Sequence, residues 1–158
     1  MTFEAGGQQY GLPLENVLQI VGMVSITRLP KSPPIVAGVV DFHGQVIPIV
    51  DIHWRLGQAA PPYTLRTPII VGHLNNRTMG IVVDQVGGVQ HLTSEQIKGT
   101  GEVFDSETVL QVHHLLGFAR LGNALLLLLD PDTFLSSAEE ESMDAALSDQ
   151  QGIHHNNS

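Results

Sequence analysis

The stretch of residues 38–56 constrains the fold of this chain more than any other. Two runs of β-branched and apolar residues, 39–42 and 46–52, are separated by His43-Gly44-Gln45, a pattern typical of a β-hairpin with glycine at its turn. Pro48 lies inside the second run and cannot donate a hydrogen bond to a neighbouring strand. We therefore expect that strand at a sheet edge, at a bulge or in the wall of a small barrel, rather than as a central strand.

Further short strands are predicted along the whole chain. A first hairpin spans 3–12 across Gly6-Gly7, and another joins 67–74 to 78–83 across Asn75-Asn76-Arg77, because asparagine tolerates left-handed turn conformations. The remaining expected strands are 24–29, 86–92, 109–112, 117–121 and 124–129. Turn signals every 8–12 residues predict an all-β barrel or sandwich. The last strand is apolar at positions 125–129, so we expect it to be buried on both faces.

Three helical segments are predicted. Apolar spacing in 14–20 suits one or two turns that end at Gly22, and 93–98 has the pattern of a short capped helix. Asp130-Pro131 is typical of a helix start, but acids dominate beyond Glu139 and the apolar stripe thins. We therefore expect a domain over 1–136 and an acidic tail over 137–158 that frays, is partly disordered and is dispensable for folding.

Composition excludes several classes of protein. A chain of 158 residues suits one compact domain, and the absence of cysteine excludes disulfides and thiolate metal sites. The net charge is −9, and the body up to residue 135 carries seven bases against eleven acids. This balance argues against nucleic acid as a partner, which needs clustered cations. Neither a secretory signal nor a membrane span is visible in the sequence, so we expect a cytoplasmic protein without direct membrane insertion.

Two Asp-x-His pairs, Asp41-x-His43 and Asp51-x-His53, suggest a metal site as an alternative. On a strand each pair places its two side chains on one face. His53 lies about nine residues from the turn, roughly 30 Å along an extended strand, so one metal cannot join the two pairs. Each pair alone supplies two ligands where three or four are usual. Solvated histidines are the favoured interpretation, and a metal- or small-molecule-binding barrel is the second hypothesis.

Patterns that indicate catalysis are missing from the sequence. There is no cysteine nucleophile, no Gly-x-Ser-x-Gly elbow and no Gly-Lys-Ser/Thr phosphate loop. Gly99-Thr100-Gly101 opens like a nucleotide loop, but the third glycine and the following helix are absent from the pattern. We therefore expect a binding module without catalytic activity and without a cofactor.

The central stretch resembles the CheW-like family of chemotaxis coupling proteins. The family pattern reads roughly P-x-x-P-x-x-x-x-G-V-x-N-L-R-G-x-V-x-P-V-V-D-L. This chain matches it with Leu29-Pro30, Pro33-Pro34, Gly38-Val39-Val40, Gly44 and 46–51. Further matches follow in order at 10–20, 80–86 and 125–130. The resemblance covers about residues 3–135 and implies two small SH3-like five-stranded barrels that share a core, with a C-terminal helix.

The resemblance also implies a function and a binding surface. Members of the family are non-catalytic adaptors that couple the cytoplasmic tips of chemoreceptors to a histidine autokinase, whose regulatory domain shares their fold. The positions that match the family's partner-binding segments are Val17, Gln19, Ile20, Gly38, Val39, Asp41, His43 and Gly44. Several of these residues have structural interpretations as well, since the two glycines suit turn geometry and the valines suit a core.

Two positions depart from the family pattern. Asp41-Phe42-His43-Gly44 replaces Asn-Leu-Arg-Gly, so an imidazole that is mostly neutral at pH 7 replaces a permanently charged guanidinium. Gln19 stands where the family usually has glutamate. Either the chain serves a divergent pathway with co-adapted partners, such as surface motility or gene regulation, or it has lost one interface.

Overall fold

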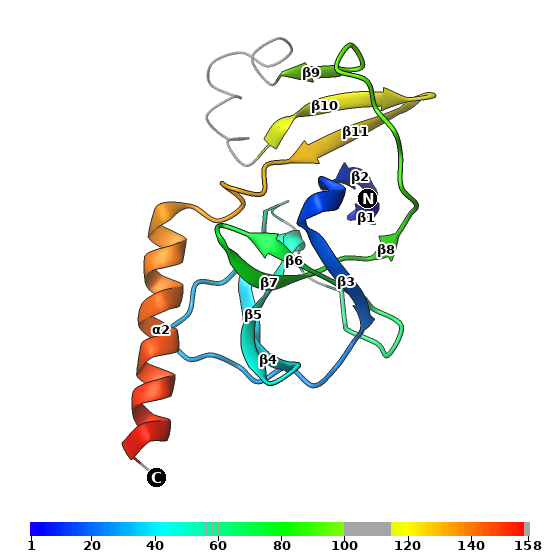
Figure 1. Cartoon of the computed structure of the whole chain (residues 1–158). Coiled ribbons are helices and arrows are strands. Elements are labelled where there is room, and N and C mark those ends of the chain that lie inside the picture. The colour runs from blue at the N-terminus through cyan, green and yellow to red at the C-terminus, as the bar shows by residue number, and fades with distance from the viewer. Residues whose placement is uncertain (56, 58, 60, 100–114, 157–158) are drawn as a thin grey trace.

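The computed structural model describes residues 1–55, 57, 59, 61–99 and 115–156. Two β-sheets lie one above the other in Figure 1, and a long C-terminal helix stands beside the lower one. The prediction of an all-β fold with a C-terminal helix is therefore confirmed.

The first sheet has six strands in the order β8-β1-β2-β11-β10-β9. Their bounds are β1 (Thr2–Ala5), β2 (Gln8–Gly11), β8 (Gln85–Val86), β9 (Ile97–Gly99), β10 (Leu115–Leu121) and β11 (Ala124–Leu129). β1 and β2 form the predicted first hairpin, and β10 and β11 form the last. β11 pairs with β2 in parallel, which joins the two ends of the chain in one sheet.

The second sheet has the order β3-β6-β7-β5-β4. Its strands are β3 (Val17–Gly22), β4 (Val36–Phe42), β5 (Gln45–Asp51), β6 (Pro68–Leu74) and β7 (Arg77–Val82). Beyond the end of β3, Thr27 exchanges two backbone hydrogen bonds with Val39 of β4, at 2.8 and 2.9 Å. This bridge connects the two outer strands, so the sheet closes into a small barrel.

The organising hairpin is confirmed, with a two-residue turn. Phe42 pairs with Gln45, and His43 and Gly44 have φ values of 53° and 82°, the left-handed conformations that tight hairpin turns favour. β5 lies between β7 and β4, so Pro48 is in a barrel wall and not at an edge. Its missing N–H costs little because pairing with β7 begins only at Ile49.

The predicted helix over 14–20 and the predicted strand over 24–29 are wrong. Only Leu14–Asn16 forms a helical turn, of the 3₁₀ type and labelled η1, and β3 follows at once. The apolar spacing in this segment arises from a strand with a bulge at Leu18, opposite β6. Residues 24–29 contribute to the second sheet only through the bridge at Thr27. Tertiary pairing thus decides the conformation of both segments.

The segment after β7 also differs from the prediction. Of the expected strand over 86–92, only Val86 lies in a strand, the two-residue β8. Instead of a helix at 93–98, a turn forms in which the Gln96 side chain accepts the Thr93 backbone N–H at 2.8 Å. This is half of a capping box, but the chain then enters β9 and no helix develops. The expected strand at 109–112 lies outside the described residues.

The C-terminal helix α2 (Ser137–Asn156) begins later than predicted. Asp130 accepts the backbone N–H of Asp132, which makes a turn and not a helix cap. The cap is Ser136, whose hydroxyl accepts the Glu139 N–H while the Glu139 carboxylate accepts the Ser136 N–H, a complete capping box. Met143 and Ala146 of α2 are buried, so the expectation of fraying beyond Glu139 is wrong. The division into a domain and a dispensable tail stays a prediction.

One core joins both sheets and α2. It includes Phe3 and Tyr10 of the first sheet, Ile70 and Met79 of the second, and Met143 of the helix. A smaller cluster fills the inside of the barrel that the second sheet forms, which we call the second barrel. The two sheets therefore share one hydrophobic core.

The strand of five leucines is less buried than predicted. β11 lies between β2 and β10, with Leu126 and Leu129 buried, Leu127 and Leu128 half-buried and Leu125 39% exposed. Full burial on both faces was therefore a wrong prediction, because Leu125 and Leu127 on one face and Leu128 on the other remain partly open to solvent.

Candidate functional site

The tip of the β4–β5 hairpin is built by a short-range hydrogen bond. Asp41 Oδ1 accepts the Gly44 backbone N–H at 2.8 Å, which closes the turn. Gly44 has a left-handed conformation, and a Cβ added at this position would have no described atom within 4 Å. The ring of His43 stands at 62° to that of Phe42, with 4.3 Å between ring centroids. The tip is therefore an ordered, exposed turn.

The tip reaches across to β3. His43 Nε2 lies 3.4 Å from Gln19 Oε1, and both side chains are exposed. On either side of Gln19 are two apolar residues, Leu18 at 57% and Ile20 at 39% exposure, and Val46 beyond the turn is 58% exposed. We call these five residues the β3–tip surface. The two positions that depart from the family pattern are thus in contact with each other.

The remaining sequence-predicted positions have structural roles. Val17 is half-buried against the main core, and Val39 is buried within it. A Cβ on Gly38 would lie 2.2 Å from the carbonyl oxygen of Thr27 and 2.6 Å from an Ile26 methyl carbon. Only glycine permits this close approach, which lets Thr27 close the barrel. Gly38 and Val39 therefore position the hairpin and do not form its exposed surface.

A second polar cluster lies at the junction of the two sheets. His53, in the 3₁₀ turn η2 (Ile52–Trp54), is buried, and its Nδ1 lies 2.5 Å from Asp51 Oδ1. Its Nε2 lies 3.0 Å from Asp84 Oδ1. Asp84 Oδ2 accepts the backbone N–H of Gly6, in the β1–β2 turn, at 2.8 Å. The imidazole thus links the second sheet to the first through two carboxylates.

The electrostatics of this cluster favour a charged imidazole. Burial alone lowers the pKa of His53, but hydrogen bonding and charge from Asp51, and then from Asp84, outweigh it, so the pKa is raised above its ordinary value. The Tyr63 hydroxyl donates a hydrogen bond to Asp51 Oδ2. Burial and this partner raise the pKa of Tyr63.

The interpretation of the histidines as solvated is wrong for His53 and consistent with the exposed His43. Sequence reasoning noticed the pair Asp51-x-His53 but missed Asp84, which lies 31 positions further on. The signal available was that both Asp51 and Asp84 directly follow apolar strand runs. His113 and His114 lie outside the described residues.

The described part of the chain holds no group of three or more histidine, aspartate or glutamate side chains placed to bind one metal ion. Within the same residues, no helix is long and apolar enough to cross a membrane.

Comparison with known proteins identifies the family. The model of the CheW-like domain matches residues 1–139. The chain belongs to the CheW-like family. The chemotaxis protein CheW of Klebsiella aerogenes is 34% identical over 139 residues, which cover 88% of this chain and 82% of that protein. The chain is therefore a chemotaxis coupling adaptor, and the function predicted from the sequence is confirmed.

Two further relatives and one solved structure are also similar to this chain. The probable chemotaxis protein CheW of Rhizobium etli is 28% identical over 141 residues, 89% of each chain. Protein FrzA of Myxococcus xanthus is 31% identical over 90 residues, 57% of this chain and 56% of that protein. The crystal structure of scaffolding protein TtCheW from Thermoanaerobacter tengcongensis superposes with a TM-score of 0.74 at 22% identity, covering 87% of this chain and 92% of that chain. This likeness confirms the fold of two SH3-like barrels.

Proposed function

We propose that this CheW-like protein couples a chemoreceptor tip to the regulatory domain of a histidine autokinase without catalysing a reaction itself, and that it uses the β3–tip surface to bind one of these partners. The contact between His43 and Gln19 carries the proposal. It joins two segments that lie 24 positions apart in the sequence into one exposed surface.

The composition of this surface suits a protein partner. Leu18, Ile20 and Val46 offer exposed apolar area, and apolar side chains together with polar ones are typical of interfaces. His43 and Gln19 supply hydrogen-bonding groups. Burial of the three apolar side chains provides affinity, while the polar pair selects the partner.

Position 43 differs in charge chemistry from the family pattern. The family resemblance implies an arginine there, which is always charged and can pair with a partner carboxylate. Such a charge-assisted hydrogen bond contributes up to about 1–2 kcal/mol to binding. His43→Arg therefore raises affinity at pH 7.5 for a partner that offers a carboxylate at this point.

Calorimetry with the kinase regulatory domain and with a receptor-tip fragment from the same host tests this. Wild type, His43→Arg and His43→Ala are each titrated at pH 6 and pH 7.5. His91, which is exposed and outside this surface, provides the matched control His91→Ala. If all variants bind both partners alike at both pH values, the tip is not part of the interface.

A further inference from the structure

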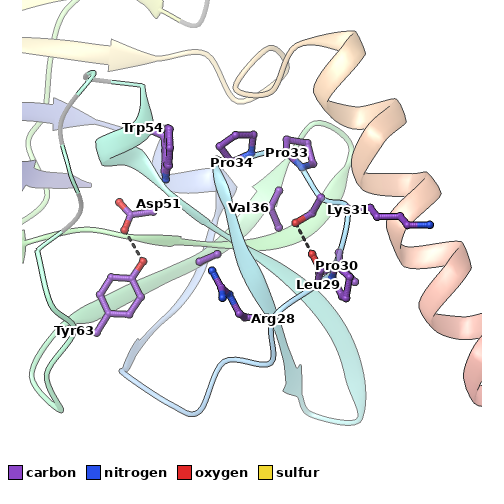
Figure 2. Close-up of a pocket in the computed structure, with 12 residues that line it drawn as sticks. Arg28, Leu29, Pro30, Lys31, Pro33, Pro34, Val36, Asp51, Trp54 and Tyr63 are labelled. Carbon is purple, nitrogen blue, oxygen red and sulfur yellow. Dashed lines mark hydrogen bonds between the residues drawn. The ribbon is translucent and has the colours of Figure 1, made fainter.

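A pocket of about 640 Å³ opens on the second barrel, at the opposite end of the β4–β5 hairpin from its tip. Figure 2 shows its walls: the loop 28–34, the start of β4, the end of β5, Trp54 and Tyr63. Asp51 is six residues along β5 from Gln45, roughly 20 Å in an extended strand. The pocket is thus a separate surface from the β3–tip surface, and its volume is within the usual range for binding sites.

The loop that forms one wall is held rigidly. Ser32 Oγ donates to the Leu29 carbonyl at 2.7 Å, and the Val36 N–H donates to the Pro33 carbonyl at 2.9 Å. Lys31 has a φ of 66°, a conformation that a lysine adopts rarely and that tends to occur at functional sites. Prolines at three positions of the loop further limit its motion. The pocket is therefore formed before any ligand binds.

The charge in the pocket is cationic. Arg28 and Lys31 are exposed and make no ion pair with any of the described residues, whereas Arg55 and Arg77 pair with acids of α2. The one acid of the lining, Asp51, is buried, and its oxygens already accept hydrogen bonds from His53 and Tyr63. Two unpaired cations therefore face solvent in a protein whose net charge is −9.

An aromatic surface lines the same pocket, although the Lys31 side chain points away from it, toward α2 (Figure 2). Trp54 is 56% exposed and Tyr63 is 37% exposed. Trp54 is the only tryptophan of the chain, and an exposed indole of this kind often marks a binding surface. Tryptophan, tyrosine and arginine are the residue types that contribute most binding energy at protein interfaces, and all three line this pocket.

We propose that this pocket binds an acidic, extended peptide segment of a partner protein, with an aromatic or proline residue between carboxylate side chains. The carboxylates pair with Arg28 and Lys31, and the ring packs on Trp54. Charge complementarity with the two cations decides for an acidic segment. The proposal goes beyond the coupling function, because it adds a second interaction surface that does not use the hairpin tip.

Trp54 makes the test direct. Because it is the only tryptophan of the chain, tryptophan fluorescence reports on this pocket. The probe is the capped peptide Ac-Asp-Glu-Phe-Pro-Glu-Asp-NH2, and its neutral counterpart is Ac-Asn-Gln-Phe-Pro-Gln-Asn-NH2. We expect a saturable change in emission with the acidic peptide, about tenfold weaker binding of the neutral one, and weakening by added salt. No saturable change, or equal affinity for both peptides, overturns the proposal without any variant being made.

Variants then assign the contacts. Arg28→Gln combined with Lys31→Gln weakens binding of the acidic peptide by about tenfold. The matched control, Lys98→Gln combined with Arg120→Gln, removes the same charge from the first sheet and leaves the affinity unchanged. Circular dichroism verifies that both double variants fold. An equal loss of affinity in both double variants overturns the site. If free phenylacetate binds as tightly as the acidic peptide, the ligand of the pocket is a small organic anion and the peptide proposal is overturned.

Discussion

Met143→Ala tests whether α2 is part of the folded domain. The Met143 side chain is fully buried in the core that both sheets share. The substitution removes a methylene, a sulfur and a methyl group, which is a transfer term of about 2 kcal/mol at ~0.8 kcal/mol per buried methylene. The cavity that remains adds to this, so we expect a loss of about 3 kcal/mol in the free energy of unfolding.

Polar contacts alone cannot produce such an effect. The ion pair between Arg77 and Asp144 is partly exposed, and pairs of this kind contribute less than about 1 kcal/mol. Burial raises the pKa of Glu139, but its hydrogen bonds from Arg55 and from the Ser136 backbone lower it overall. Arg55 also donates to the Phe134 carbonyl at 2.8 Å. These contacts orient the start of α2, whereas Met143 supplies the apolar burial.

Urea unfolding followed by circular dichroism gives the free energy, and a thermal scan gives a second reading. For a chain of this length 3 kcal/mol lowers the melting temperature by roughly 6–12 °C. Glu141→Ala, at an exposed position of the same helix, is the control and changes stability by less than about 0.5 kcal/mol. A loss below about 1 kcal/mol for Met143→Ala refutes the docking of α2 and supports a dispensable tail.

Three further perturbations follow from the geometry. Leu126→Ala destabilises by about 2–5 kcal/mol and the exposed Leu125→Ala by far less, and equal losses in urea unfolding contradict the observed burial. The pKa of His53 is raised in the folded protein, so its charged contacts stabilise the fold fully below pH ~6.5, and this stabilisation is lost as the pH rises through the folded-state pKa. The stability advantage of wild type over His53→Gln therefore shrinks from pH 6 to pH 9. An advantage that stays constant over this range refutes the argument. Gly38→Ala places a Cβ against the Thr27 carbonyl oxygen and therefore costs more stability than Gly44→Ala, which causes only backbone strain. A larger drop in melting temperature for Gly44→Ala would show that the barrel closes differently.

The sequence was sufficient to predict the elements whose local chemistry and tertiary pairing agree. Both turn pairs, His43-Gly44 and Asn75-Asn76, adopt the left-handed conformations that their residues favour, and the hairpins around them form as predicted. Asn75 does more than turn the chain. Its side chain donates to the Leu135 carbonyl and accepts the Leu135 N–H, at 2.9 and 2.8 Å. No local pattern predicts that contact, because it joins positions 60 apart.

Where local and tertiary preferences disagree, the prediction failed. Residues 17–22 have helical apolar spacing, yet they form β3 because β6 pairs with all of them except the bulged Leu18. The start of α2 was placed at Asp130, since Asp-Pro is a common helix start. The capping box of Ser136 and Glu139 was present in the sequence and identifies the true start.

The candidate site was predictable only in part. The resemblance to the family pointed to positions 19 and 43, but the sequence does not show that their side chains touch. The cluster around His53 and the pocket beside Trp54 both bring together residues that are distant in the sequence. Such sites are products of barrel closure and have no local signal of their own.

The central claim is that this chain couples receptors to a kinase. It is tested most directly by measuring autophosphorylation of the host's histidine autokinase with receptor-containing membranes, in the presence and in the absence of the purified protein. The account predicts that receptors change the kinase rate only when the wild-type protein is present, and that a variant with Leu18→Asp and Ile20→Asp, which disrupts the β3–tip surface, restores little of this control. Receptor control of the kinase that is equally strong without the protein would contradict the account.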